Sequence, residues 1–122
     1  MKSRVRILVV DDEPLIRRAF QKLFQDARFE VLFAEDGAAG LKLWNESSPD
    51  FVFLDVIMPV LNGWEVLEQK KSWSGTRVFV MSAFTGDLAQ KKIWMEKIDG
   101  FLQKPFEDVM KIKKWVEDAL QS

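Results

Sequence analysis

The chain has 122 residues, a formal net charge of −1, and a composition that is 48% hydrophobic and 30% charged. This length suits one compact domain, and the near-neutral charge excludes a general electrostatic attraction to nucleic acid or to acidic membranes. The sequence contains no Cys and no His, which excludes disulfides, thiol catalysis, and the commonest general base and transition-metal ligand.

The N-terminal residues 1–4 lead directly into the apolar run Val5–Val10. Because this run is short and has no small-residue cleavage signal after it, it predicts a strand and not a signal peptide. No apolar run in the sequence approaches the roughly 20 residues that a membrane span needs. We therefore expect a cytoplasmic protein, with one domain over residues 1–122 and no second domain.

Short β-rich runs alternate with helical patterns along the whole sequence. Two of these runs, Val5–Val10 and Phe51–Leu54, are apolar nearly throughout, which is typical of strands buried on both faces of a parallel sheet. In chain order, the predicted strands are Val5–Val10, Phe29–Ala34, Phe51–Leu54, Arg77–Met81 and Gly100–Leu102.

The predicted helices separate these strands and follow the last one. Pro14 suits the first turn of the first helix, and apolar residues recur at helical spacing in the first and the last helix. Those residues are Leu15, Ala19, Leu23 and Phe24, then Val109, Ile112, Val116 and Leu120. The predicted helices are Pro14–Asp26, Gly37–Glu46, Gly63–Lys71, Asp87–Glu96 and Glu107–Leu120. Five strand–helix pairs indicate an α/β domain with helices on both faces of a parallel sheet.

Polar side chains stand at the ends of four predicted strands. Asp11 and Asp12 follow the first strand, Asp55 follows the third, Ser82 the fourth and Lys104 the fifth. In an open parallel sheet these carboxyl ends meet at one rim, where ligands bind, so we expect the side chains to converge. Carboxylates that close raise one another's pKa, and a hard dication relieves that repulsion. The pattern therefore predicts a site for Mg²⁺, with Mn²⁺ as the alternative ion.

The loop after Asp55 offers one further ligand, the backbone carbonyl of Ile57. With a cation in place, Asp55 can act as a nucleophile toward phosphorus and form an aspartyl phosphate. Such a transfer needs alignment and stabilisation of charge on three phosphoryl oxygens. The cation would meet one oxygen, Lys104 a second, and the Ser82 hydroxyl with the Ala83 backbone N–H a third.

Each of these residues also has a purely structural interpretation. An aspartate at a strand end often caps a helix, so Asp11 and Asp12 could simply cap the first helix. A Lys-Pro pair such as Lys104-Pro105 is a common turn element. The joint occurrence of all these groups on one predicted rim favours a site.

The sequence also resembles the receiver domain of two-component response regulators over nearly its whole length. The resemblance implies a flavodoxin-like (βα)₅ fold, doubly wound, with a parallel five-stranded sheet of order 2-1-3-4-5. It rests on Val9-Val10-Asp11-Asp12-Glu13, Leu54-Asp55-Val56-Ile57-Met58-Pro59, Asn62-Gly63-Trp64-Glu65-Val66-Leu67, Met81-Ser82-Ala83 and Phe101-Leu102-Gln103-Lys104-Pro105-Phe106.

The resemblance further implies that Asp55 accepts a phosphoryl group from a histidine of a sensor histidine kinase or a histidine phosphotransfer protein. It implies direct Mg²⁺ coordination by Asp12, Asp55 and the Ile57 carbonyl, with Asp11 acting largely through water. Self-phosphotransfer and slow autodephosphorylation are then the only expected activities, so we do not expect a turnover enzyme.

The resemblance assigns the switch from the modified site to Ser82 and Phe101. Many relatives carry tyrosine at the second position, and Phe101 lacks that hydroxyl, so its inward state depends on packing. The implied output face is the fourth helix, fifth strand and fifth helix, where Ile93, Trp94 and Met95 suit a partner helix or a phosphorylation-dependent homodimer. Alternatively, these three residues pack into the core.

Two apolar side chains, Ile57 and Phe84, are expected to flank the phosphoryl group. Neither can position an attacking water, so we expect slow hydrolysis of the aspartyl phosphate.

Three other functions compete with this interpretation. A Mg²⁺-dependent aspartyl-phosphate phosphatase typically has a second Asp two positions after the nucleophile, where this chain has Ile57. A flavin or nucleotide binder needs a glycine-containing first turn, whereas residues 11–14 are acidic. A receiver-like interaction module that does not depend on phosphorylation remains the main alternative. Direct nucleic-acid binding is not expected.

Overall fold

A five-stranded parallel sheet forms the centre of the protein, in the order β2-β1-β3-β4-β5. The computed structural model describes residues 4–83 and 92–121, apart from the side chain of Ile93. The strands are β1 Val5–Val10, β2 Phe29–Ala34, β3 Phe51–Asp55, β4 Arg77–Ser82 and β5 Gly100–Gln103. The predicted fold class and strand order are therefore confirmed.

Three of the strands extend one residue beyond their predicted ends. The parallel register continues through the pairs Asp55 with Met81 and Ser82 with Gln103. Two polar residues that were expected just after strands are thus their last members. Hydrogen bonds to a neighbouring strand hold the backbone of a strand residue, and its side chain therefore points in a fixed direction.

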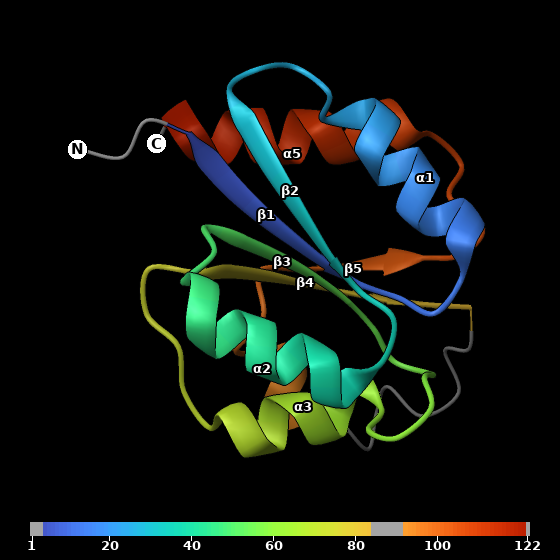
Figure 1. The fold of residues 1–122 in the computed structure, drawn as a ribbon, viewed down its shortest axis with the longest axis vertical. Helices are drawn as coiled ribbons and strands as arrows, with labels where there is room; N and C mark the ends of the chain where they lie inside the picture. The colour runs from blue at the N-terminus through green and yellow to red at the C-terminus, as the bar shows by residue number, and fades with distance from the viewer. Residues whose placement is uncertain (1–3, 84–91, 122) are drawn as a thin grey trace.

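Helices cover both faces of the sheet (Figure 1). They are α1 Pro14–Leu23, α2 Gly37–Ser47, α3 Gly63–Lys70, α4 Lys92–Met95 and α5 Val109–Gln121. α1 and α5 lie on one face, where Phe20, Phe24, Ile112 and Val116 form one apolar cluster with Phe53 and other residues of the sheet. On the other face α2 and α3 pack on the sheet, and the partly buried Trp94 and Met95 of α4 join that cluster. Each face thus has its own apolar core.

Helix boundaries differ from the prediction where a side chain intervenes. α1 ends at Leu23 and not at Asp26, because Asp26 turns the chain: its carboxylate accepts from the Arg28 backbone N–H at 2.9 Å. α5 begins at Val109, because the Asp108 carboxylate accepts from the Met110 N–H at 3.0 Å. The predicted helix 87–96 is helical at Lys92–Met95, and its residues 87–91 lie outside the described part.

The predicted inner face of α1 was partly wrong. Leu15 is 73% exposed, whereas Phe20 is 1% exposed and provides the main contact with the sheet. In α5 the stripe is buried at its centre, but Val109 and Leu120 at its ends are exposed. Apolar residues near helix ends extend past the sheet, so spacing alone overestimates their burial.

Within the described residues, no helix has the length and apolar character that crossing a membrane requires.

Candidate functional site

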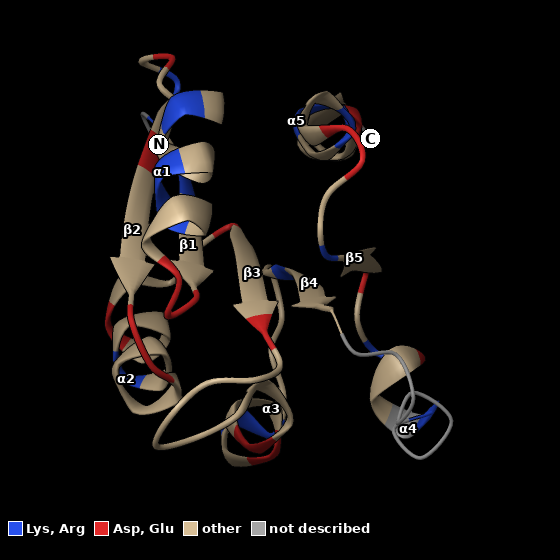
Figure 2. Cartoon of the chain, turned by 90° about the vertical axis from the view of Figure 1, so that its right-hand side faces the viewer, with Lys and Arg blue, Asp and Glu red and all other residues tan. Residues whose placement is uncertain are grey.

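Acidic side chains gather where the strands end on one rim of the sheet. Figure 2 shows them in red at the tip of β3 and in the loop that follows β1. β1 and β3 are adjacent, with Val10 opposite Leu54. Asp11, which follows Val10, and Asp55, which follows Leu54, therefore come together as predicted.

Lys104 joins these acids from the end of β5. Its Nζ donates to Asp11 Oδ2 at 2.7 Å and lies 3.4 Å from Asp55 Oδ2. All three side chains are buried, with Asp11 0%, Asp55 4% and Lys104 8% exposed. Charged groups are seldom removed from water to this extent unless they are paired, because the loss of hydration is costly.

The local backbone holds Asp11 in one orientation. Its N–H donates to the Ala34 carbonyl at 3.0 Å, which continues the β1–β2 ladder past the end of β1. Its Oδ1 accepts from the Glu13 N–H at 2.8 Å, and its carbonyl accepts from Arg17 Nη1 at 2.9 Å. Asp11 is thereby fixed on its main chain and on one carboxylate oxygen.

Asp55 is held by the close approach of α3 to the end of β3. The Gly63 N–H donates to the Val56 carbonyl at 2.8 Å. A Cβ at Gly63 would lie 2.4 Å from the Asp55 carbonyl oxygen, so only glycine permits this approach. The reciprocal capping box of Asn62 and Glu65 then fixes the start of α3.

Burial changes the acidity of these groups. It raises the pKa of Asp55 to about 6, with the nearby Asp11 charge adding to the effect and Lys104 opposing it. Burial also raises the pKa of Asp11, again against the hydrogen bond from Lys104. Burial alone would lower the pKa of Lys104, but its hydrogen bonds to Asp11 and Glu13 prevail and raise it to about 12. Lys104 therefore stays charged while the acids around it repel one another.

The acids can hold a divalent cation. Asp11, Asp12, Glu13 and Asp55 each offer a carboxylate oxygen, and these four atoms lie within 4.8 Å of one another. Only oxygen donors are present in this group, which suits Mg²⁺ or Mn²⁺ better than a softer metal. The negative charge exceeds that of the single ammonium, so an added cation would relieve it.

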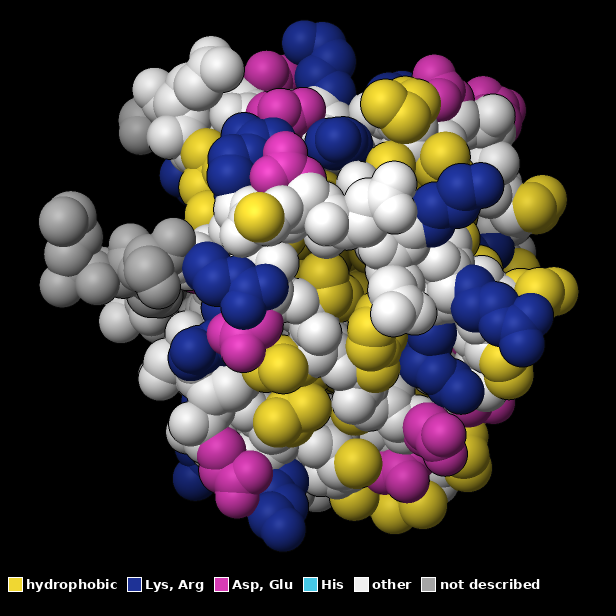
Figure 3. Space-filling model, turned by 45° about the horizontal axis from the view of Figure 1, so that its top comes forward, with side chains coloured by type: hydrophobic (Ala, Val, Ile, Leu, Met, Phe, Trp, Pro, Cys, Tyr) yellow, Lys and Arg dark blue, Asp and Glu magenta, His cyan; other side chains and the backbone are white. Residues whose placement is uncertain are grey.

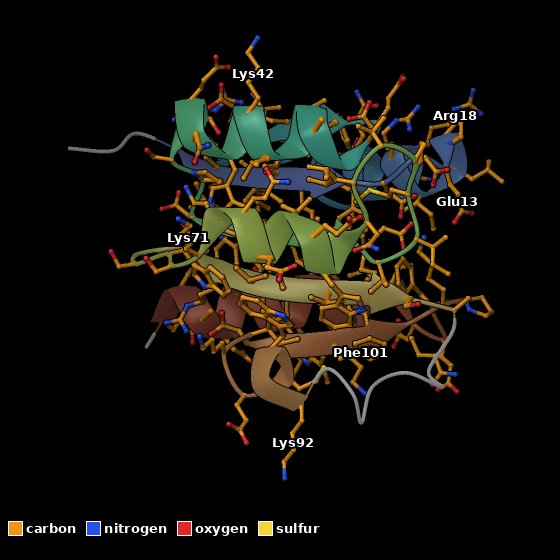
Figure 4. The ribbon with its side chains drawn as sticks, turned by 90° about the horizontal axis from the view of Figure 1, so that it is seen from below. Glu13, Arg18, Lys42, Lys71, Lys92 and Phe101 are labelled. Atoms are coloured by element: carbon orange, nitrogen blue, oxygen red, sulfur yellow. The ribbon has the colours of Figure 1, made fainter. Side chains whose placement is uncertain are left out.

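Other predicted site residues are placed around this cluster. Ser82 is 1% exposed at the end of β4, and its carbonyl accepts from the Lys104 backbone N–H at 2.9 Å. The Ile57 side chain is 62% exposed in the β3–α3 loop. Phe101 is half-buried and packs on the face of the sheet that carries α2 and α3 (Figure 4). Phe84 lies outside the described residues.

Glu13 is a site residue that the sequence patterns did not single out. Its Oε1 accepts a hydrogen bond from Lys104 Nζ at 2.9 Å, although the Glu13 side chain is 56% exposed. Figure 4 shows Glu13 beyond the strand ends, at the rim of the sheet. A glutamate directly before a helix-starting proline has a longer side chain than the residues that usually cap a helix. This unusual residue at the N-cap was the one sequence signal that Glu13 has another role.

Comparison with known proteins gives a consistent family. The family model described as "Response regulator receiver domain" matches residues 7–117. The transcriptional regulatory protein KdpE of Mycobacterium tuberculosis is 34% identical over 100 residues, which are 82% of this chain and 44% of that protein. The chain also spans only 42 to 44% of three further curated relatives.

Solved structures agree on the fold. The N-terminal domain of an uncharacterized protein from Wolinella succinogenes is 30% identical with a TM-score of 0.82, and the match covers 93% of this chain and 92% of that one. A CheY-like receiver domain protein from Methanospirillum hungatei has a TM-score of 0.85 at 21% identity, covering 98% of this chain and 95% of that one. The second likeness bears on the fold alone.

Proposed function

Because the chain belongs to the response regulator receiver domain family, we propose that it is a phosphorylation-controlled switch or relay module with Asp55 as phosphoacceptor. Receiver domains pair with histidine kinases in two-component systems and are not classical enzymes. The observation that carries the proposal is the buried Asp55 carboxylate, 3.4 Å from the Lys104 ammonium and beside three further acids of the rim.

A bound Mg²⁺ would supply positive charge that draws a phosphoryl group to the rim and neutralises the acids. Asp12, Asp55 and the Ile57 carbonyl are the proposed direct ligands, with Asp11 acting largely through water. Mn²⁺ would suit the same oxygen donors.

In the proposed reaction an Asp55 carboxylate oxygen attacks the phosphorus of a partner phosphohistidine. The new O–P bond forms as the P–N bond breaks, and the imidazole leaves with the electron pair of that bond. Lys104 stabilises charge on one transferring oxygen, while the Ser82 hydroxyl and the Ala83 N–H stabilise another. The absence of His from the sequence agrees with a donor supplied by the partner.

We propose that Ser82 and Phe101 transmit the modification to α4, β5 and α5. Phe101 lies on β5, within that face, and Ser82 ends β4, the strand next to it. Phe101 packs against the apolar cluster on the face of the sheet that carries α2 and α3, so its switch would depend on packing. The half-burial of Trp94 and Met95 favours core packing for these two side chains over a fully exposed docking surface.

The remaining assignments are proposals about the whole protein. They are a receiver domain over residues 1–122, a histidine kinase or histidine phosphotransfer protein as donor, and a homodimer formed on phosphorylation. The alternative of an interaction module without phosphorylation is less well supported, because Asp55, Asp11 and Lys104 converge as phosphoryl transfer requires.

Intact mass after incubation with Mg²⁺ and acetyl phosphate tests the proposal. Wild type is expected to gain one phosphoryl group, and Asp55→Asn none. Asp118→Asn on the exposed side of α5 is the matched control and should be labelled like wild type. Labelling of Asp55→Asn equal to that of wild type would remove Asp55 from its proposed role.

A further inference from the structure

We propose that Glu13 is a positioning residue that holds the Lys104 ammonium in the unphosphorylated protein and yields it to a phosphoryl oxygen when Asp55 is modified. The inference rests on the proposed function, because it adds a residue to the same site. Its starting point is the 2.9 Å hydrogen bond from Lys104 Nζ to Glu13 Oε1.

The Lys104 ammonium is surrounded by acids. Its Nζ donates to Asp11 Oδ2 at 2.7 Å and to Glu13 Oε1 at 2.9 Å, and it forms a longer ion pair with Asp55 Oδ2 at 3.4 Å. A phosphoryl group on Asp55 would place its oxygens beyond the carboxylate that Lys104 now meets. An ammonium drawn toward those oxygens must weaken one of its two shorter hydrogen bonds.

Asp11 is poorly suited to give up the ammonium. It is 0% exposed, and its second carboxylate oxygen already accepts from the Glu13 N–H at 2.8 Å. Releasing Lys104 would leave a buried carboxylate without its cation, which is strongly unfavourable. Asp11 should therefore keep its hydrogen bond in both states.

Glu13 is the partner that can be exchanged. Its side chain is 56% exposed, so water can replace Lys104 at little cost. Among the described residues, Lys104 is the one hydrogen-bond partner of its carboxylate. Glu13 can thus occupy the ammonium before modification and leave it afterwards.

The backbone position of Glu13 explains why its carboxylate is available. It is the N-cap of α1, and its carbonyl accepts from the backbone N–H groups of Ile16 and Arg17 at 3.1 and 3.2 Å. Its side chain makes no capping bond within the described part of the chain. Short side chains are preferred at an N-cap, so a glutamate here gives up that bond and instead reaches Lys104.

Three variants distinguish the effect of the Glu13–Lys104 hydrogen bond from the effect of the negative charge of Glu13. Glu13→Gln keeps the length and removes the charge. Glu13→Asp keeps the charge but is one methylene shorter, so it should lose Lys104 and cap α1 instead. Glu35→Gln removes a charge from a neighbouring loop, where the 79% exposed Glu35 pairs with Arg17 at 3.5 Å.

The test is the rate of phosphorylation of the full chain by acetyl phosphate, at Mg²⁺ concentrations shown by titration to saturate each variant. Glu13→Gln and Glu13→Asp should lower the half-saturating acetyl phosphate concentration by about three- to fivefold, the size expected of a partly exposed ion pair. The maximal rate should stay near that of wild type, and Glu35→Gln should match wild type in both constants.

The ammonium signal of Lys104 provides a second readout. In ¹⁵N-lysine-labelled protein, Glu13→Asp should shift this signal in the unmodified state but not after beryllofluoride is bound. A merely structural role of Glu13 would not confine the change to one state. Thermal unfolding of each variant shows whether it is folded.

Two outcomes would overturn the inference. If only Glu13→Gln lowered the half-saturating concentration, net charge and not the contact would be responsible. If neither Glu13 variant changed the half-saturating concentration, the hydrogen bond from Lys104 to Glu13 would have no effect on phosphorylation. If wild type itself were not labelled, the proposed function would be wrong. Failure of the proposed function can therefore be distinguished from failure of the inference about Glu13.

Discussion

At the scale of single residues, Asp55 combines burial with a surplus of like charge. Its pKa is raised to about 6, first by burial and then by Asp11. The folded protein therefore binds a proton at Asp55 more readily than the unfolded chain does. By linkage, the free energy of unfolding falls as the pH rises from about 4 through about 6, and the loss persists at higher pH.

Asp55→Asn should accordingly stabilise the metal-free protein at neutral pH. The shift of about two pKa units sets a ceiling near 3 kcal/mol, and we expect about 1 to 2 kcal/mol in urea unfolding at pH 7.5 with EDTA. Near pH 4 the gain should shrink, because Asp55 is then protonated in the folded state. A gain independent of pH would contradict this origin.

Val60 has a strained backbone conformation. It has φ of 70°, lies at the centre of a turn in which the Leu61 N–H donates to the Pro59 carbonyl at 2.9 Å, and is 74% exposed. A hydrogen bond between residues two apart defines a γ-turn, and with positive φ this turn is strained and unfavourable for a β-branched residue.

Val60→Asn should therefore raise the free energy of unfolding by about 1 kcal/mol, because asparagine tolerates positive φ. Val60→Thr is the matched control: it is also polar but keeps the β-branch, so no gain is expected. Chemical denaturation measures both, and equal gains for the two variants would rule out backbone strain as the cause.

At the scale of elements, the approach of α3 to β3 links packing to the site. A Cβ at Gly63 would meet the Asp55 carbonyl oxygen at 2.4 Å, whereas one at Gly40 would meet the Val10 side chain at 2.6 Å. Both glycines allow a helix to contact the sheet, but only the first lies against the backbone of Asp55, the proposed phosphoacceptor.

Gly63→Ala should thus impair labelling of Asp55 by acetyl phosphate at least tenfold, in addition to a loss of about 2 kcal/mol in stability. Gly40→Ala should lose comparable stability and retain labelling near the wild-type rate below its unfolding temperature. Equal labelling defects in the two variants would show that stability alone, and not the Asp55 backbone, is affected.

The positions of the strands, and of the polar residues at their carboxyl ends, could be predicted from the sequence. Continuous apolar runs identified β1 and β3, and the rule that parallel strands end on one rim was enough to group Asp11, Asp55 and Lys104 from sequence alone. The inner face of α1 could not be settled in this way. Spacing from Leu15 and spacing through Phe20 are equally helical, and only the direction of the helix on the sheet decides between them.

Contacts made by individual side chains could not be predicted from the sequence either. The engagement of Glu13 with Lys104 joins residues 91 positions apart through two flexible side chains. Likewise, α1 ends early because Asp26 bonds to the backbone of Arg28, a local contact that competes with helix continuation. Apolar periodicity contains no information on either contact.

At the scale of the whole molecule, positive and negative charges nearly balance, with 18 Lys and Arg against 19 Asp and Glu. Figure 3 shows lysines and arginines interspersed with acids on the face viewed there, and the net charge is only −1. The acidic rim is therefore a local feature and not part of a general negative field. A cation should act on stability through that rim alone.

Mg²⁺ at about 10 mM should raise the melting temperature of wild type by about 3 °C, since it binds only the folded state. Asp12→Asn, which removes an exposed proposed ligand, should show a smaller rise. NaCl at equal ionic strength is the control for screening. An equal rise with NaCl, or with Asp12→Asn, would argue against a specific cation site.

The hydrogen bond between Lys104 and Asp11 spans 93 positions of the chain. During translation, a nascent polypeptide that has not yet reached Lys104 lacks the ammonium counter-ion of the rim acids. On the proposed function, we expect products truncated before Lys104 not to accept a phosphoryl group, because they lack the ammonium that the proposed transfer uses.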